Sequence, residues 1–119
     1  MDQAFCQHFA HAWISAWNAH DLDQILAHYS DDFTMTSPFI ISIAGDATGT
    51  LHGKAAVADY WADALTRIPD LHFELHTILI GVDSLTLYYT GVGRRLSAET
   101  LHFNADGKVQ RAYAHYASS

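Results

Sequence analysis

The sequence is poor in several residue types that would point to particular classes of protein. It contains one cysteine, Cys6, so no disulfide can form within the chain, and we expect a reducing compartment. Lysine and arginine number 6 against 13 aspartate and glutamate residues, which gives a net charge of −7 with neutral histidines. That balance argues against partners such as nucleic acid and anionic membrane surfaces, because both require a basic face.

Long apolar runs are also missing. No stretch approaches the roughly 18 apolar residues that span a bilayer. Residues 1–5 lack the basic start and continuous apolar run of a signal peptide, so we expect a cytoplasmic protein. Hydrophobic residues nevertheless make up 50% of the 119 residues, which is enough to build the core of a single domain over residues 1–119.

Three helices are predicted in the first part of the chain. Aromatic residues recur at every fourth position over residues 3–17, as on the buried face of an amphipathic helix. Asp21 is placed to cap a second, short helix, and Gln24 three positions later completes a capping box. A third helix opens at Gly53 and stops before Pro69, because the residue before a proline avoids the helical conformation.

Strands are predicted around and after these helices. Residues 31–39 alternate in polarity, and Pro38 should end that strand because proline has no N–H for the ladder. The stretch 40–52 is rich in small residues and is predicted as a partial hairpin or flap over the mouth of a cavity. Further strands are predicted at residues 71–76, 85–96, 99–103 and 108–117. Helices followed by antiparallel strands favour an α+β fold, with a curved sheet wrapped around three helices as a cone with an apolar interior.

The segment from Asn18 to Phe39, together with Gly53-Lys54 and the paired C-terminal strands, resembles the nuclear transport factor 2-like superfamily. Within that superfamily it is most similar to the SnoaL-like and ketosteroid-isomerase-like proteins, and the resemblance covers nearly the whole chain. It implies a cone-shaped fold, a pocket for a small apolar molecule, and a homodimer formed through the outer face of the sheet.

The resemblance can be carried over to individual positions. In the ketosteroid isomerases an aspartate base precedes the proline of the first strand, while a tyrosine and an un-ionised aspartic acid stabilise the enolate oxygen. The base position falls on Ser37, the tyrosine position on Trp13 and the neutral-acid position on Glu99. Serine is not a base near neutral pH unless a partner takes its proton, and an indole N–H only donates. One part of three matches in kind, which argues against isomerisation by that mechanism, although Ser37 stays a candidate catalytic residue.

Glu99 is the main catalytic candidate. It shares a strand face with Leu101 and Phe103, because the period of a strand is two residues. A carboxyl that points into an apolar cone has a raised pKa, which suits general acid–base chemistry, and some SnoaL-type polyketide cyclases resemble this plan. The alternative is that Glu99 pairs with Arg94 or Arg95 and has a structural role only. The limonene-epoxide-hydrolase relatives need a second acid in the cone, and none can be placed.

Large apolar side chains are expected to form the wall that binds the substrate. The predicted wall consists of Trp13, Trp17, Phe33, Met35, Tyr60, Trp61 and Tyr116. The alternative for several of these residues is plain core packing. His72 and His76, with Glu74 between them, have a spacing that could bind zinc. They alternate with apolar residues, however, so we expect them on the outer face of the sheet, and we expect no metal site and no cofactor.

Three classes of function remain open at this point. The leading one is an enzyme of the isomerase or cyclase kind that acts on an apolar, carbonyl-bearing small molecule, with Glu99 as acid or base. The second is a non-catalytic protein that binds a small apolar ligand in the same pocket. The third is an interaction module in which the predicted pocket is only core.

Overall fold

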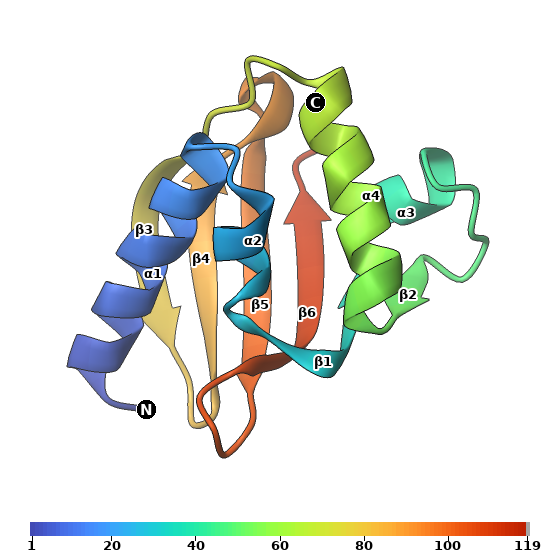
Figure 1. Cartoon of the computed structure of the whole chain (residues 1–119). Helices are drawn as coiled ribbons and strands as arrows, with labels where there is room; N and C mark the ends of the chain where they lie inside the picture. Colours follow the sequence, from blue (N-terminus) through green and yellow to red (C-terminus); the bar gives the residue numbers. More distant parts are fainter. Residues whose placement is uncertain (119) are drawn as a thin grey trace.

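The computed structural model describes residues 1–118. Figure 1 shows a curved six-stranded sheet, in the order β2-β1-β6-β5-β4-β3, with the long helices gathered on one of its faces. The helices are α1 (Gln3–Asn18), α2 (Leu22–Leu26), α3 (Pro38–Ser42) and α4 (Lys54–Arg67), and a short 3-10 turn is η1 (Val92–Arg94). The strands are β1 (Tyr29–Thr36), β2 (Thr50–His52), β3 (Glu74–Ile80), β4 (Ser84–Thr90), β5 (Leu96–Phe103) and β6 (Val109–Tyr116).

The helices α1, α2 and α4 are the three that the sequence predicts. Phe9, Trp13 and Trp17 of α1 are buried, as the four-residue spacing requires. At the start of α2, the Asp21 carboxylate accepts a hydrogen bond from the backbone N–H of Gln24 at 3.2 Å, which confirms the predicted N-cap. In the described part of the chain, no helix has both the length and the apolar character that crossing a membrane would need.

The predicted flap contains a helix that the sequence analysis did not foresee. The hydroxyl of Ser37 accepts a hydrogen bond from the Phe39 amide at 3.2 Å, and Pro38 occupies the first helical position of α3. Both features favour the beginning of a helix, so β1 ends earlier than residue 39. The strand within the predicted stretch is β2, which pairs antiparallel with β1 and places Thr50 opposite Thr36.

The strand predicted over residues 85–96 was wrong in its length. It breaks at Gly91, and the chain reverses through η1, where Gly93 and Arg94 adopt positive φ angles of 68° and 60°. Strands β4 and β5 therefore form a hairpin, in which Leu87 lies opposite Glu99. Gly93 adopts its positive φ without a steric penalty, and Gly91 leaves room for the Tyr89 ring, which would lie 2.9 Å from a Cβ at that position.

Two other features of the sheet differ from the prediction. The strand predicted at residues 71–76 begins only at Glu74 and continues to Ile80, with a register shift between Leu75 and Thr77. The sheet is also not wholly antiparallel, because β1 runs parallel to β6. These two strands are far apart in sequence, so no tight hairpin turn forces them to run in opposite directions.

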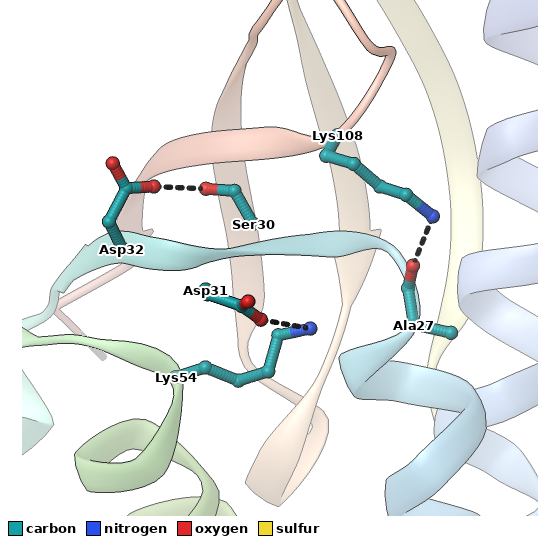
Figure 2. Close-up of polar contacts among 6 residues, drawn as sticks. All are labelled: Ala27, Ser30, Asp31, Asp32, Lys54 and Lys108. Carbon is teal, nitrogen blue, oxygen red and sulfur yellow. Dashed lines mark hydrogen bonds and ion pairs between the residues drawn. The ribbon is translucent and has the colours of Figure 1, made fainter.

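Polar contacts fix the start of β1 against its neighbours (Figure 2). The ammonium of Lys54, at the beginning of α4, lies 3.5 Å from a carboxylate oxygen of Asp31. The Lys108 ammonium, next to the β5–β6 loop, donates to the carbonyl of Ala27 at 2.8 Å. Both contacts are at the surface, so they orient the chain more than they stabilise it.

The two faces of the sheet have different surroundings. The concave face carries buried residues such as Leu85, Leu87 and Leu101, which pack beneath the helices. The outer face carries threonine pairs between neighbouring strands, including a hydrogen bond between Thr86 and Thr100 at 2.9 Å. The candidate site lies on the concave side.

Candidate active site

A cavity of about 140 Å³ is bounded by the concave face of the sheet and by residues of α1, α3 and α4. Every layer of the fold contributes to its wall. The lining residues are Trp17, Met35, Ser37, Phe39, Ile43, Tyr60, Trp61, Ala64, Ile68, Leu71, Phe73, Tyr89, Val92, Glu99 and Tyr116. The wall is thus mainly apolar and aromatic, with one carboxyl and a few hydroxyl groups, which is the usual character of a small-molecule site.

Most of the residues that the sequence analysis singled out meet in this wall. They are Trp17, Met35, Ser37, Tyr60, Trp61, Glu99 and Tyr116. Trp13 and Phe33 do not line the cavity and lie in the core behind it. The indole N–H of Trp13 donates to the Tyr29 hydroxyl at 2.9 Å, and the Phe33 ring packs 4.5 Å from the Tyr29 ring. Sequence periodicity identifies the buried face of an element, but it does not separate core from cavity wall.

Glu99 points into the cavity, as the strand period predicts. Its side chain is buried, with the whole residue 4% exposed, and it accepts a hydrogen bond from the Tyr89 hydroxyl at 3.0 Å. Burial raises the pKa of Glu99 from 4.5 to about 7, and the hydrogen bond from Tyr89 opposes that rise. The environment therefore favours the neutral acid up to about neutral pH.

The alternative of an ion pair between Glu99 and an arginine was wrong. No ion pair that includes Glu99 occurs among residues 1–118. The guanidinium of Arg95 instead lies over the ring of Phe39, 5.8 Å from its centroid. Phe39 in turn stacks on Tyr116, with ring centroids 4.3 Å apart. The cation–π contact thus joins the residue before β5 to the first turn of α3, and the ring stacking joins that turn to β6.

Tyrosine hydroxyls surround the carboxyl of Glu99. For Tyr29, Tyr60, Tyr89 and Tyr116 burial is the main cause of a raised pKa, and the charge of Glu99 raises each pKa further. The pKa of Tyr60 reaches about 12. These phenols therefore keep their protons near neutral pH, and the three that line the cavity, Tyr60, Tyr89 and Tyr116, can act as hydrogen-bond donors there.

Ser37 is a hydrogen-bonding residue in this site. Burial raises the pKa of both Tyr60 and Tyr116, and hydrogen bonding with the Ser37 side chain opposes that rise, so the serine hydroxyl lies close to the two phenols. Over the described part of the chain, Glu99 is the one aspartate, glutamate, histidine, lysine or arginine in the cavity wall, and so the one such group that could take the serine proton. No hydrogen bond joins Ser37 to Glu99 among residues 1–118, so the structure shows Ser37 as a hydrogen-bonding residue and not as an activated nucleophile.

The indole N–H of Trp17 is an unusual feature of the wall. It is buried and has no hydrogen-bond partner among residues 1–118, although the ring lines the cavity. A buried donor without a partner costs free energy, which a ligand oxygen could recover. The same ring packs against Trp61 at 5.1 Å and against Phe73 at 5.4 Å, so its position is well fixed.

The sequence analysis missed several wall residues, of which Tyr89 is the most important. A signal for it was present, because Leu85, Leu87 and Tyr89 share one face of β4 and all are buried. Phe39 and Ile43 were missed because the helix α3 was not predicted.

The histidines stay away from the cavity. His72 and His76 are exposed, and the His76 ring lies 2.6 Å from the Thr90 hydroxyl. Throughout residues 1–118, no group of three or more histidine, cysteine, aspartate or glutamate side chains is arranged to hold a metal ion.

Comparisons with known proteins agree with this architecture. The SnoaL-like domain family matches residues 10–117. The chain is 54% identical to a SnoaL-like protein of unknown function from Burkholderia thailandensis, over 98% of both chains and with a TM-score of 0.96. No curated protein matches the sequence.

More distant structures share the fold. One is a protein of unknown function from Cytophaga hutchinsonii, described as NTF2-like, with 12% identity over 94% of this chain and 89% of that chain and a TM-score of 0.72. Another is a hypothetical protein with a ketosteroid isomerase-like fold from Catenulispora acidiphila, in complex with trimethylamine, with 17% identity over 92% and 85% and a TM-score of 0.73. The chain therefore belongs to the SnoaL-like family, and it has the nuclear transport factor 2-like fold that its sequence predicts.

Proposed function

We propose that this protein is an enzyme of the isomerase or cyclase kind, in which Glu99 moves a proton on an apolar, carbonyl-bearing small molecule. The observation that supports it most is the carboxyl itself, buried in an apolar cavity without a cation, with a pKa of about 7. A carboxyl with a pKa near the working pH can both accept and donate a proton efficiently. Such an environment is costly for a group with a purely structural role.

Glu99 is the one acid–base group with a pKa near neutral that lines the cavity in the described residues, so a single carboxyl must both remove and return the proton. In its ionised form it takes the acidic proton from the carbon next to the carbonyl group, and the electron pair moves to the oxygen as an enolate. The protonated Glu99 then gives the proton to another carbon of the conjugated system, which shifts the double bond without a co-reactant. The hydroxyls of Tyr60, Tyr116 and Ser37 are the donors that would stabilise the enolate oxygen.

The test is proton transfer on a one-ring β,γ-unsaturated ketone, followed by the ultraviolet absorbance of the conjugated product. We expect Glu99→Gln to lower the rate by about 10²–10⁴-fold, the usual contribution of a placed acid or base. Ligand binding, measured by quenching of tryptophan fluorescence, should persist, because the shape of the side chain is kept. Val82→Ala is the control, since Val82 is 91% exposed and lies outside the cavity wall.

The second candidate is a non-catalytic protein that binds a small apolar ligand. It is favoured by the absence of a second acid–base group beside Glu99 within the described cavity wall, and by the hydrogen bond that Ser37 makes as the cap of α3. The same assay separates the two functions. Equal rates for the wild type and Glu99→Gln, with ligand binding intact in both, would identify a binding protein.

We also propose that two copies of the chain associate through the outer face of the sheet. The long helices cover only the concave face (Figure 1), which leaves the outer face of the sheet open to packing against a second copy of the chain. Exposed apolar side chains on the outer strands support this proposal, because Leu79, Tyr88 and Leu96 are 59%, 38% and 44% exposed.

A further inference from the structure

We propose that the substrate is a one-ring or short-chain carbonyl compound, and that Ile68, Leu71 and Val92 set this size limit. The carbonyl chemistry rests on the function proposed above. The size limit rests on the cavity alone, so the two parts can fail independently.

The volume of the cavity supports a small ligand. At about 140 Å³ it is close to an engineered protein cavity of about 150 Å³ that binds benzene. Sites for drug-sized ligands usually measure about 300–1,000 Å³. A fused polycyclic ketone, such as a steroid or a polyketide aglycone, is several times larger than benzene and does not fit inside this cavity without a change in the wall.

The aromatic part of the wall resists such a change. Trp17, Trp61 and Phe73 are each at most 7% exposed. The ring of Phe73 lies 5.4 Å from Trp17 and 4.8 Å from Tyr89, which itself holds Glu99. Moving any of these rings would disturb the hydrophobic core, whose close packing makes displacement costly.

The aliphatic part of the wall is thinner. A second depression of about 380 Å³ lies beside the cavity, and Ile68, Leu71 and Val92 line both spaces. These three side chains thus form a partition, defined here as the shared wall of the cavity and the depression. Other residues of the depression are polar or are glycines, and include Asp70, His72, Glu74, Gly91, Gly93 and Arg94.

The position of the polar groups determines which end of the ligand meets the partition. Glu99, Ser37, Tyr60 and Tyr116 line the cavity but not the depression. A carbonyl oxygen that binds these groups therefore stays in the inner cavity, and the rest of the ligand extends toward the apolar wall. The partition limits the length of that apolar part.

The experiment measures dissociation constants for a one-ring, a two-ring and a four-ring ketone, with cyclohex-2-en-1-one, 1-tetralone and androst-4-ene-3,17-dione as probes. Wild type and the partition variants Val92→Ala and Ile68→Ala are compared by tryptophan fluorescence and calorimetry. Both replaced residues are half-buried, so at least one variant should fold. Ile41→Ala is the matched control, because Ile41 is 51% exposed and lines neither the cavity nor the depression.

We expect the wild type to bind the one-ring ketone and to show no binding of the four-ring ketone up to its solubility limit. Each partition variant should bind the two-ring ketone about 10-fold more tightly than the wild type does, which is the usual effect of adding space for a methylene group or more. The affinities of Ile41→Ala for all three ketones should change little. If the wild type binds the four-ring ketone as tightly as the one-ring ketone, the size limit is overturned while the proposed function stands. If a folded partition variant gains nothing for the two-ring ketone, the role of the partition is overturned. If the wild type binds none of the ketones, the proposed carbonyl chemistry fails. The size limit is then tested with two hydrocarbons: binding of benzene but not of naphthalene supports it, and any other result overturns it.

Discussion

Replacing Glu99 by glutamine should change how the stability of the protein depends on pH. In the unfolded chain the carboxyl titrates near 4.5, whereas burial raises its pKa in the folded protein to about 7. Below pH 4.5 it is neutral in both states. Between the two pKa values the unfolded chain loses this proton while the folded protein keeps it, so the free energy of unfolding falls as pH rises.

The magnitude follows from the two pKa values. Each pKa unit corresponds to 1.36 kcal/mol, so a change from 4.5 to about 7 amounts to about 3 kcal/mol. Glutamine has nearly the same shape, carries no charge, and can still accept the hydrogen bond from Tyr89. Between pH 4.5 and pH 8.5 the wild type should therefore lose about 3 kcal/mol of stability relative to Glu99→Gln.

Urea unfolding at several pH values measures this difference directly. Any constant cost of burying the glutamine amide cancels, because only the change with pH is compared. An exposed glutamate on the same sheet, Glu74, provides the control variant Glu74→Gln, for which we expect a curve parallel to that of the wild type. Parallel curves for Glu99→Gln and the wild type would refute the reasoning, since they would mean that Glu99 titrates alike in the folded and unfolded states.

Three further predictions concern a neighbour of Glu99, the core and the outer face of the sheet. Tyr89→Phe removes the hydrogen bond that lowers the pKa of Glu99, so that pKa should rise above the wild-type value in a carbon-detected NMR titration; an unchanged value would contradict the contact. Trp13→Phe leaves the buried Tyr29 hydroxyl without its donor and should cost about 1–3 kcal/mol in urea unfolding, whereas a neutral effect would show that the bond adds no stability. In sedimentation velocity at low micromolar concentration the wild type should be a dimer and Tyr88→Glu a monomer, and a monomeric wild type would rule out the interface.

Much of the fold could be predicted because local signals and burial agree. The four-residue aromatic spacing of α1, the cap at Asp21 and the alternation in β5 each specify one element, and the structure has all three. The errors lie where backbone conformation overrides side-chain pattern. The η1 turn interrupts an apolar alternation because Gly93 adopts the positive φ at which the chain reverses.

The cavity was harder to predict than the fold. Strand alternation correctly turned Glu99 inward, but alternation also placed Phe33, and helical spacing Trp13, on an inward face, where they fill the core. Whether an inward side chain meets a cavity depends on the sizes of all its neighbours, and that is a property of packing in three dimensions. The short helix α3 adds Phe39 and Ile43 to the wall, and they could have been found by reading Ser37-Pro38 as a helix start.

The serine at position 37 also bears on the chemistry at Glu99. In the ketosteroid isomerases, which this chain resembles, the position of Ser37 carries the ionised base and that of Glu99 carries a neutral acid. Two carboxyls in one small cavity disfavour each other's ionisation, which keeps one of them protonated. With serine at position 37 that repulsion is absent, and the pKa of Glu99 is set by burial and by the hydrogen bond from Tyr89. Glu99 can then ionise near neutral pH and act as the base itself, while the Ser37 hydroxyl joins Tyr60 among the donors around a substrate oxygen.

We therefore expect Ser37→Asp, which restores the second carboxyl, to raise the pKa of Glu99 and to move any Glu99-dependent activity to higher pH. A pH–rate profile unchanged by this substitution would show that the two positions do not share one electrostatic site.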